Sequence, residues 1–159
     1  MTDNFIKLNE DNLLRLKIKT DKGEYTGEEL VFDLEDIELP LRLQDMVESD
    51  KKNKLWLKNQ FAIIDRRQDV KGKKLLSKNQ EDKYKALQDF FKKEVEIYNM
   101  FLGENGVQKL LNGRKFGWTS LNEIDEIIKK QILPVLNDKV KSMEDLIKNK
   151  YSTTDEEVI

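Results

Sequence analysis

The sequence of 159 residues contains no histidine and no cysteine, and these two absences exclude much of the common catalytic and metal-binding chemistry. Without cysteine the chain can form neither a disulfide framework nor a thiolate metal site. Without histidine it lacks the imidazole general base, the Ser-His triad and the commonest zinc ligand. We therefore expect a non-enzymatic protein with no cofactor and no metal.

Long apolar runs are also missing. No stretch approaches the ~20 residues of a membrane span, and the start, Met1 to Asn4, lacks the basic and apolar regions of a signal peptide. These features predict a cytoplasmic protein with no membrane partner. Apolar residues make up only 38% of the chain and charged residues another 38%, against typical values of about 45–50% and ~25%. Such a composition predicts a thin helical fold, or one whose apolar stripes are completed by a partner.

The net charge of −2 conceals three blocks of charge along the chain. Residues 1–50 carry 14 acidic against 6 basic side chains, a net charge of −8. Residues 51–93 carry 14 basic against 5 acidic side chains, a net charge of +9, and residues 94–159 carry 9 against 12, a net charge of −3. Blocks of opposite sign can neutralise each other within one chain or between the subunits of a homo-oligomer.

The period of the apolar residues changes at Pro40. Before it, Leu14, Leu16 and Ile18 alternate with basic residues, and the run 30–34 is extended and apolar except for Asp33, which predicts a β-hairpin over residues 13–34. Turns are possible at residues 21–23 or 26–28, so the register is left open. After Pro40 the spacing is helical, with Pro40 in the first helical position.

Three helical stretches follow, separated by residue types that end helices. The polar residues 48–54 leave open whether the first stretch is one helix or two. Residues 66–74 form a basic loop, and Ser77 with Gln80 predicts a capping box for the second helix, which Gly103 ends. A short helical turn at 107–111 closes at Asn112 and Gly113. Ser120 with Glu123 predicts a second capping box, and Pro134 predicts a kink or break further on.

The predicted fold class is α+β, mainly α: a β-hairpin, then three to five helices, then a disordered acidic tail. The predicted domain organisation is one domain over residues 1–149, made of a hairpin region (1–38) and a helical region (39–149), with a flexible tail at 150–159. The tail is polar, acidic and aperiodic, so it has little apolar surface to offset the entropy of ordering.

Three clusters of residues have chemical interpretations that are weaker than their structural ones. The acidic cluster between Glu28 and Glu38 lacks the convergent ligand set of a cation site, so it is interpreted as a solvated face. The basic block with interleaved aromatic residues resembles a single-stranded nucleic-acid surface, but its aromatic residues lie on the apolar stripe. The glycines between 103 and 117 match no phosphate-binding motif. Binding of nucleic acid is therefore not the preferred interpretation.

Phe116 and Trp118 flank Gly117 in a predicted loop between two helices. Aromatic residues in loops often cover the edge of a core, and they are also enriched in interface hot spots, so both interpretations are kept. The helical stripe that follows is the predicted partner-binding surface, with Phe116 and Trp118 at its edge: Leu121, Ile124, Ile128, Ile132 and Val135.

Four segments resemble the tail-assembly chaperone-like proteins of long-tailed phages and prophages of Gram-positive bacteria. They are Leu8–Leu16, Phe32–Pro40, Phe101–Gly106 and Leu111–Lys115. The resemblance implies a non-enzymatic protein that covers the hydrophobic helix of the tape-measure protein until tail-tube subunits polymerise around it. The partners it implies are the tape-measure protein and the tail-tube protein, in the cytoplasm of the bacterial host. Two alternatives remain: a structural tail or head-tail component of the virion, and a small nucleic-acid-associated regulator.

Overall fold

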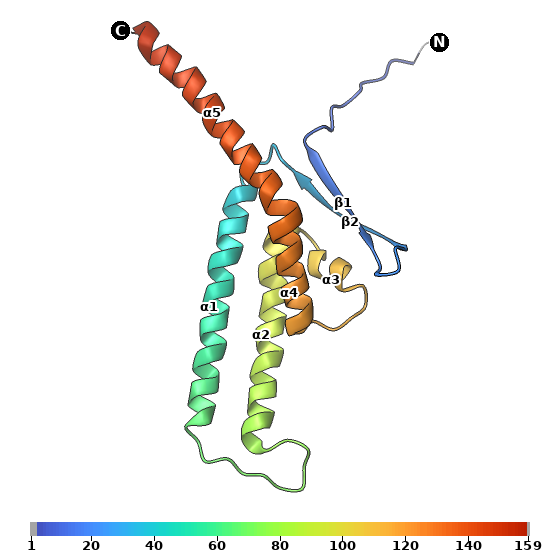
Figure 1. Ribbon diagram of the computed structural model, residues 1–159, viewed down its shortest axis with the longest axis vertical. Helices are drawn as coiled ribbons and strands as arrows, with labels where there is room; N and C mark the ends of the chain where they lie inside the picture. Colours follow the sequence, from blue (N-terminus) through green and yellow to red (C-terminus); the bar gives the residue numbers. More distant parts are fainter. Residues whose placement is uncertain (1–2, 159) are drawn as a thin grey trace. The chain divides into compact units, whose positions relative to one another are not determined.

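The computed structural model describes the backbone of residues 3–158 and the side chains of residues 3–150. The fold class is α+β and mainly α, as the sequence predicts: a two-stranded antiparallel hairpin precedes the helices (Figure 1). The described residues form two compact units. One consists of residues 41–121, and the other joins the residues up to Pro40 to those from Asn122 onward. A single domain over residues 1–149 stays a prediction.

The hairpin pairs β1 (Leu13–Lys19) with β2 (Tyr25–Asp33). Its turn lies at residues 20–24, where the N–H of Gly23 donates to the carbonyl of Thr20 and Gly23 has a positive φ of 84°. This resolves the register that the sequence leaves open. The apolar residues of the two strands share one face, because Leu14 lies opposite Phe32 and Leu16 opposite Leu30. Leu30 and Phe32 are buried.

The first helix, α1 (Leu39–Asp65), is continuous, so the polar residues 48–54 do not interrupt it. It begins one residue before Pro40, which lies in the first turn, where the backbone N–H has no helical partner. The second helix, α2 (Lys78–Leu102), begins at the predicted capping box and ends at Gly103. The two helices run side by side in opposite directions (Figure 1), and the Asn53 side chain donates to the carbonyl of Phe90.

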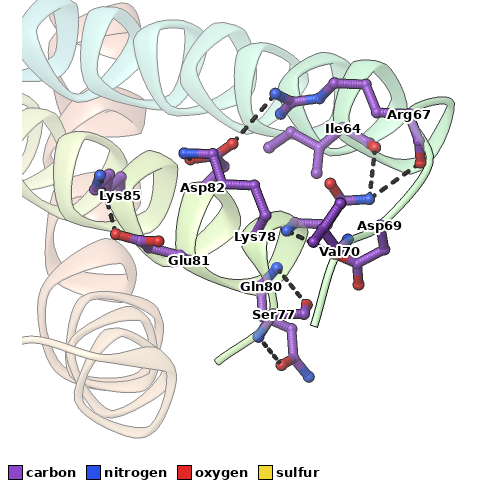
Figure 2. Close-up of polar contacts among 11 residues, drawn as sticks. Ile64, Arg67, Asp69, Val70, Ser77, Lys78, Gln80, Glu81, Asp82 and Lys85 are labelled. Carbon is purple, nitrogen blue, oxygen red and sulfur yellow. Dashed lines mark hydrogen bonds and ion pairs between the residues drawn. The ribbon is translucent and has the colours of Figure 1, made fainter. Parts of the chain in front are cut away.

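The loop between α1 and α2 is tied to both helices (Figure 2). Ser77 Oγ accepts from the N–H of Gln80, whose side chain accepts from the N–H of Ser77. The Asn79 side chain donates to the carbonyls of Ile64 and Arg67, and Arg67 pairs with Asp82 at 3.2 Å. The segment 66–74, predicted as a basic loop, therefore belongs to a connection that hydrogen bonds and an ion pair hold between two antiparallel helices.

A short helix, α3 (Gly106–Leu111), packs closely on the end of α2 and ends where Asn112 and Gly113 both have positive φ. Gly106 is buried, and a Cβ atom on it would lie 2.5 Å from the Cβ of Leu102. Asn99 Oδ1 accepts from the N–H of Val107 at 2.8 Å and fixes the same junction. The absence of a side chain at Gly106 thus permits the close approach of α2 and α3.

We expect Gly106→Ala to lower the free energy of unfolding by about 1–3 kcal/mol, because the added methyl group meets a Cβ that cannot rotate away. Urea denaturation of the purified protein measures this. Gly72→Ala is the matched control, since nothing lies within 4 Å of the corresponding Cβ and its φ is not positive. Equal stability of the two variants would contradict the close packing of α2 and α3.

The last helical run joins α4 (Trp118–Ile127), a π-helical segment at Ile128–Ile132 and α5 (Leu133–Val158). Pro134 has no N–H to donate to the carbonyl four residues earlier. The chain accommodates it with a π-turn, in which the N–H of Leu133 donates to the carbonyl of Ile128. The expected distortion near Pro134 is therefore present, and the helix continues through it.

Two predictions for this run need correction. The helix begins at Trp118 rather than at Ser120, because Ser120 Oγ accepts from the N–H of Gly117, so Ser120 takes the third helical position instead of the cap. The backbone is helical through Val158, where the sequence predicts disorder from Lys150 onward. A helix that is already formed gains one hydrogen bond for each residue added, so polar residues can extend it. Flexibility of the segment 150–159 stays a prediction, and Ile159 lies outside the described residues.

Candidate partner-binding site

Most of the predicted partner-binding surface is buried in the structure. Four of the seven residues are almost fully buried, namely Leu121, Ile124, Ile128 and Ile132. Phe116 and Val135 are half-buried. Trp118 is exposed over 48% of its surface. The four isoleucine and leucine side chains thus belong to the core, and they offer no surface to a partner in this conformation.

Trp118 and Phe116 pack on a pair of aromatic side chains from α2. The ring of Trp118 lies 5.3 Å from that of Phe90 and 5.0 Å from that of Phe91, and Phe116 lies 5.4 Å from Phe91. Phe90 is fully buried. Since Trp118 is also half exposed, it covers the edge of a core and presents a surface at the same time. Both interpretations of this residue are therefore compatible with its position.

Trp118 also lines a groove along α1, which we call the Trp118 groove. Its volume is about 530 Å³. The other lining residues recur at helical spacing along one face of α1: Lys54, Leu57, Lys58, Phe61, Ala62 and Asp65. The floor is therefore apolar and partly aromatic, and lysines flank it toward one end. The α1 residues of this groove are outside the predicted stripe, and Trp118 is the only one of the seven predicted residues among the lining residues of the groove.

A polar cluster lies between α1 and α2. The Asn53 side chain donates to Glu94 Oε1 at 2.8 Å, and Lys54 Nζ lies 2.9 Å from Asp50 Oδ2. Glu94 is 0% exposed. Among the residues that the structure describes, no hydrogen-bond donor reaches Glu94 Oε2 or Asp50 Oδ1. Two buried carboxyl oxygens without a donor are explained if the two groups share a proton.

The protonation of Glu94 follows from this environment. Burial first, and then the hydrogen bond with the Asp50 carboxyl and its negative charge, raise the pKa of Glu94 from 4.5 to about 8. The Asn53 amide and the positive charge of Lys54 act against this shift. At neutral pH Glu94 is therefore mainly the neutral acid, which donates to Asp50 and accepts from Asn53. Such a group specifies how the two helices pair.

Sequence reasoning missed Asp50, Asn53 and Glu94. The only local signal is that Asp50 and Asn53 fall at helical spacing between the buried Met46 and Leu57. From the sequence, residues 48–54 therefore resemble an interruption of the apolar stripe. Glu94 is 41 residues away from Asn53, so nothing local indicates that the two side chains pair. Among the described residues, no group of histidine, cysteine or acidic side chains is arranged to hold a metal ion.

Comparison with family models, curated proteins and solved structures identifies no match to this chain. Within the described residues, no helix has both the length and the apolar character needed to cross a bilayer.

Proposed function

We propose that this protein is a non-enzymatic binding protein that holds an amphipathic helix of its partner in the Trp118 groove. The setting is the one that the sequence resemblance implies, namely phage tail assembly in the cytoplasm of the bacterial host. The partner helix then belongs to the tape-measure protein, which the protein covers and keeps soluble until tail-tube subunits replace it. Neither ATP nor turnover is required.

The observation that carries the proposal is the exposed Trp118 over an apolar groove in a highly charged chain. Tryptophan is among the residue types most enriched in interface hot spots, and contiguous exposed apolar surface marks sites of interaction. The groove follows one face of α1, so a second helix can lie along it with apolar residues at positions i, i+3, i+4 and i+7. Lys58 would pair with an acidic residue on the flank of that helix.

The energetics of this docking suit a transient chaperone. Burying a few apolar side chains contributes about 1.5–3 kcal/mol each, and association costs about 4–15 kcal/mol. With four side chains at the upper value and the lowest association cost, the difference is about 8 kcal/mol, so the affinity is micromolar at best and not nanomolar. A partner held at this strength can be released when polymerising tail-tube subunits compete for it.

We expect Ala62→Glu to weaken binding of a tape-measure fragment by at least about tenfold, because the new side chain fills the groove without removing any core contact. Ala62 is exposed, so folding is preserved. The control is Asn59→Glu, which introduces the same side chain at an exposed position of the same helix that does not line the groove. Fluorescence anisotropy of a labelled fragment measures both affinities.

Co-expression tests the proposal as a whole. A tape-measure fragment that is insoluble alone should become soluble with this protein and should precipitate with the Ala62→Glu variant. A fragment that is equally soluble alone would rule out the chaperone function. Stable incorporation of the protein into finished tails would favour the structural alternative, and salt-dependent binding of single-stranded nucleic acid would favour the regulator.

A further inference from the structure

The residues before β1 form an arm that buries little within its own chain. Residues 3–10 have no regular secondary structure, and Phe5, Ile6 and Leu8 are 83%, 90% and 80% exposed. Each of these side chains would contribute about 1.5–3 kcal/mol if it were buried. Three such residues within four positions are an apolar patch that its own chain leaves uncovered.

The arm is anchored at its base and is acidic on both sides of the patch. The N–H of Leu13 donates to the carbonyl of Glu10 at 3.0 Å, and the N–H of Asp11 donates to Asn9 Oδ1 at 2.9 Å. Asp3 precedes the patch and Asp11 follows it. Residues 3–11 carry three acidic side chains against one basic side chain, so their net charge is −2.

A second groove between α1 and α2 has the complementary character, and we call it the Trp56 groove. Its volume is about 430 Å³, and it shares no residue with the Trp118 groove. Ile97 and Asn53 are buried at its floor, and the apolar side chains of Trp56 and Met100 remain partly exposed. Its other lining residues are Ser49, Lys52, Lys93 and Glu96.

The charges of the Trp56 groove come from both helices. Lys52 belongs to α1 and Lys93 to α2, and both side chains are mostly exposed. Lys52 Nζ lies 3.9 Å from a Glu48 carboxyl oxygen, and Lys93 Nζ donates a hydrogen bond of 3.4 Å to Glu96 Oε2. Such exposed pairs contribute little and can exchange partners. The groove therefore presents apolar surface flanked by a lysine from each helix, with Glu96 beside Lys93.

We propose that the N-terminal arm of one copy of this chain docks in the Trp56 groove of a second copy. The apolar patch between Asp3 and Asp11 matches the apolar groove between Lys52 and Lys93. The occupant is a second copy because the patch stays exposed in its own chain.

The dimensions agree with this docking. Eight extended residues span at most about 26 Å, whereas the axes of two packed helices are about 8–10 Å apart. The arm can therefore cross the groove while its base stays attached to β1. Each copy offers one arm and one groove on different segments, so the contact is heterologous and can continue from copy to copy. Because the Trp118 groove is separate, the inference does not depend on the proposed function.

Disulfide trapping tests the docking directly, because the natural chain contains no cysteine. The full-length Leu8→Cys variant is mixed under mild oxidation with Lys52→Cys, or with Lys58→Cys as the control on the other groove. All three positions are exposed, so the variants fold. A mass tag on one partner separates mixed disulfides from those between identical copies. We expect the mixed disulfide between positions 8 and 52 (the 8–52 product) to exceed the one between positions 8 and 58 (the 8–58 product) by at least about tenfold.

Two other outcomes would overturn the proposal. Equal yields of the 8–52 and 8–58 products would show that the arm collides with the surface without a preferred site. A double variant with Leu8→Cys and Lys52→Cys that closes within one chain, at a rate independent of concentration, would show that the arm occupies its own groove.

Charge reversal provides a second and independent readout. We expect Asp3→Lys and Lys93→Glu each to weaken self-association several-fold in sedimentation equilibrium. Their combination in one chain should recover most of the loss, since it restores an opposite pair across the contact. The weakening of self-association by each single variant should become smaller between 0.1 M and 1 M salt, because the Debye length falls from about 10 Å to 3 Å. Failure of the combination to recover association would contradict the proposed docking.

Discussion

Glu94→Gln is expected to make the protein more stable at pH 8 and to remove most of the loss of stability between pH 5 and pH 8. The Glu94 carboxyl titrates at a pKa of about 8 in the folded state and near 4.5 when unfolded. Between these values the folded protein holds one more proton than the unfolded chain. The free energy of unfolding of the natural protein should therefore fall as the pH rises, by up to about 1.4 kcal/mol per pH unit.

Glutamine reproduces the hydrogen bonds of the protonated acid. Its carbonyl oxygen can accept from the Asn53 amide, as Glu94 Oε1 does, and its amide can donate to Asp50. Since glutamine does not ionise, the variant avoids the cost of placing a second negative charge beside Asp50. The advantage over the natural protein should be small near pH 5 and largest at pH 8 and above.

Urea denaturation at pH 5, 6, 7, 8 and 9 measures this difference. The control is Glu96→Gln, which changes a largely exposed carboxylate on the same helix and should leave the pH profile parallel to that of the natural protein. Other carboxylates titrate as well, but their contributions cancel when the variant and the natural protein are compared. A constant difference across the pH range would mean that Glu94 is not protonated in the folded state.

The elements that local sequence determines could be predicted. The hairpin follows from alternation at Leu14 and Leu16, and the start of α2 from the reciprocal hydrogen bonds of Ser77 and Gln80. The ends of α2 and α3 follow from residues that tolerate positive φ, Gly103 and Asn112. In each case the deciding interaction lies within a few residues, or is repeated with a fixed period, so the residue types alone contain it.

The features that depend on distant partners could not be predicted. The polar residues Asp50 and Asn53 lie inside α1 and meet Glu94 from another helix, a contact that no local pattern contains. The stripe around Ile128 has the same helical pattern whether a partner or its own chain covers it, because periodicity shows which face is apolar and not what it contacts. For the same reason, periodicity does not indicate the two grooves on α1, because their lining also comes from residues elsewhere in the chain.

Ile128→Asp is expected to unfold the protein or to lower its free energy of unfolding by about 4 kcal/mol or more. Ile128 is almost fully buried, and a carboxylate at this position would lose its hydration without gaining a charged or hydrogen-bonding partner. A stability of about 5–15 kcal/mol is usual for a folded domain, so this loss is a large part of the total. Circular dichroism during thermal and urea denaturation measures it.

The control is Ile147→Asp, which makes the same substitution in the same helical run, in α5, at a residue that is half exposed. Its loss should stay within about 1 kcal/mol, since the new carboxylate remains in water. The comparison also decides the role of the stripe. If Ile128→Asp is as stable as the natural protein yet no longer binds a tape-measure fragment, the stripe is a partner surface after all. If it unfolds while Ala62→Glu folds and fails to bind, the stripe is core and the Trp118 groove holds the partner.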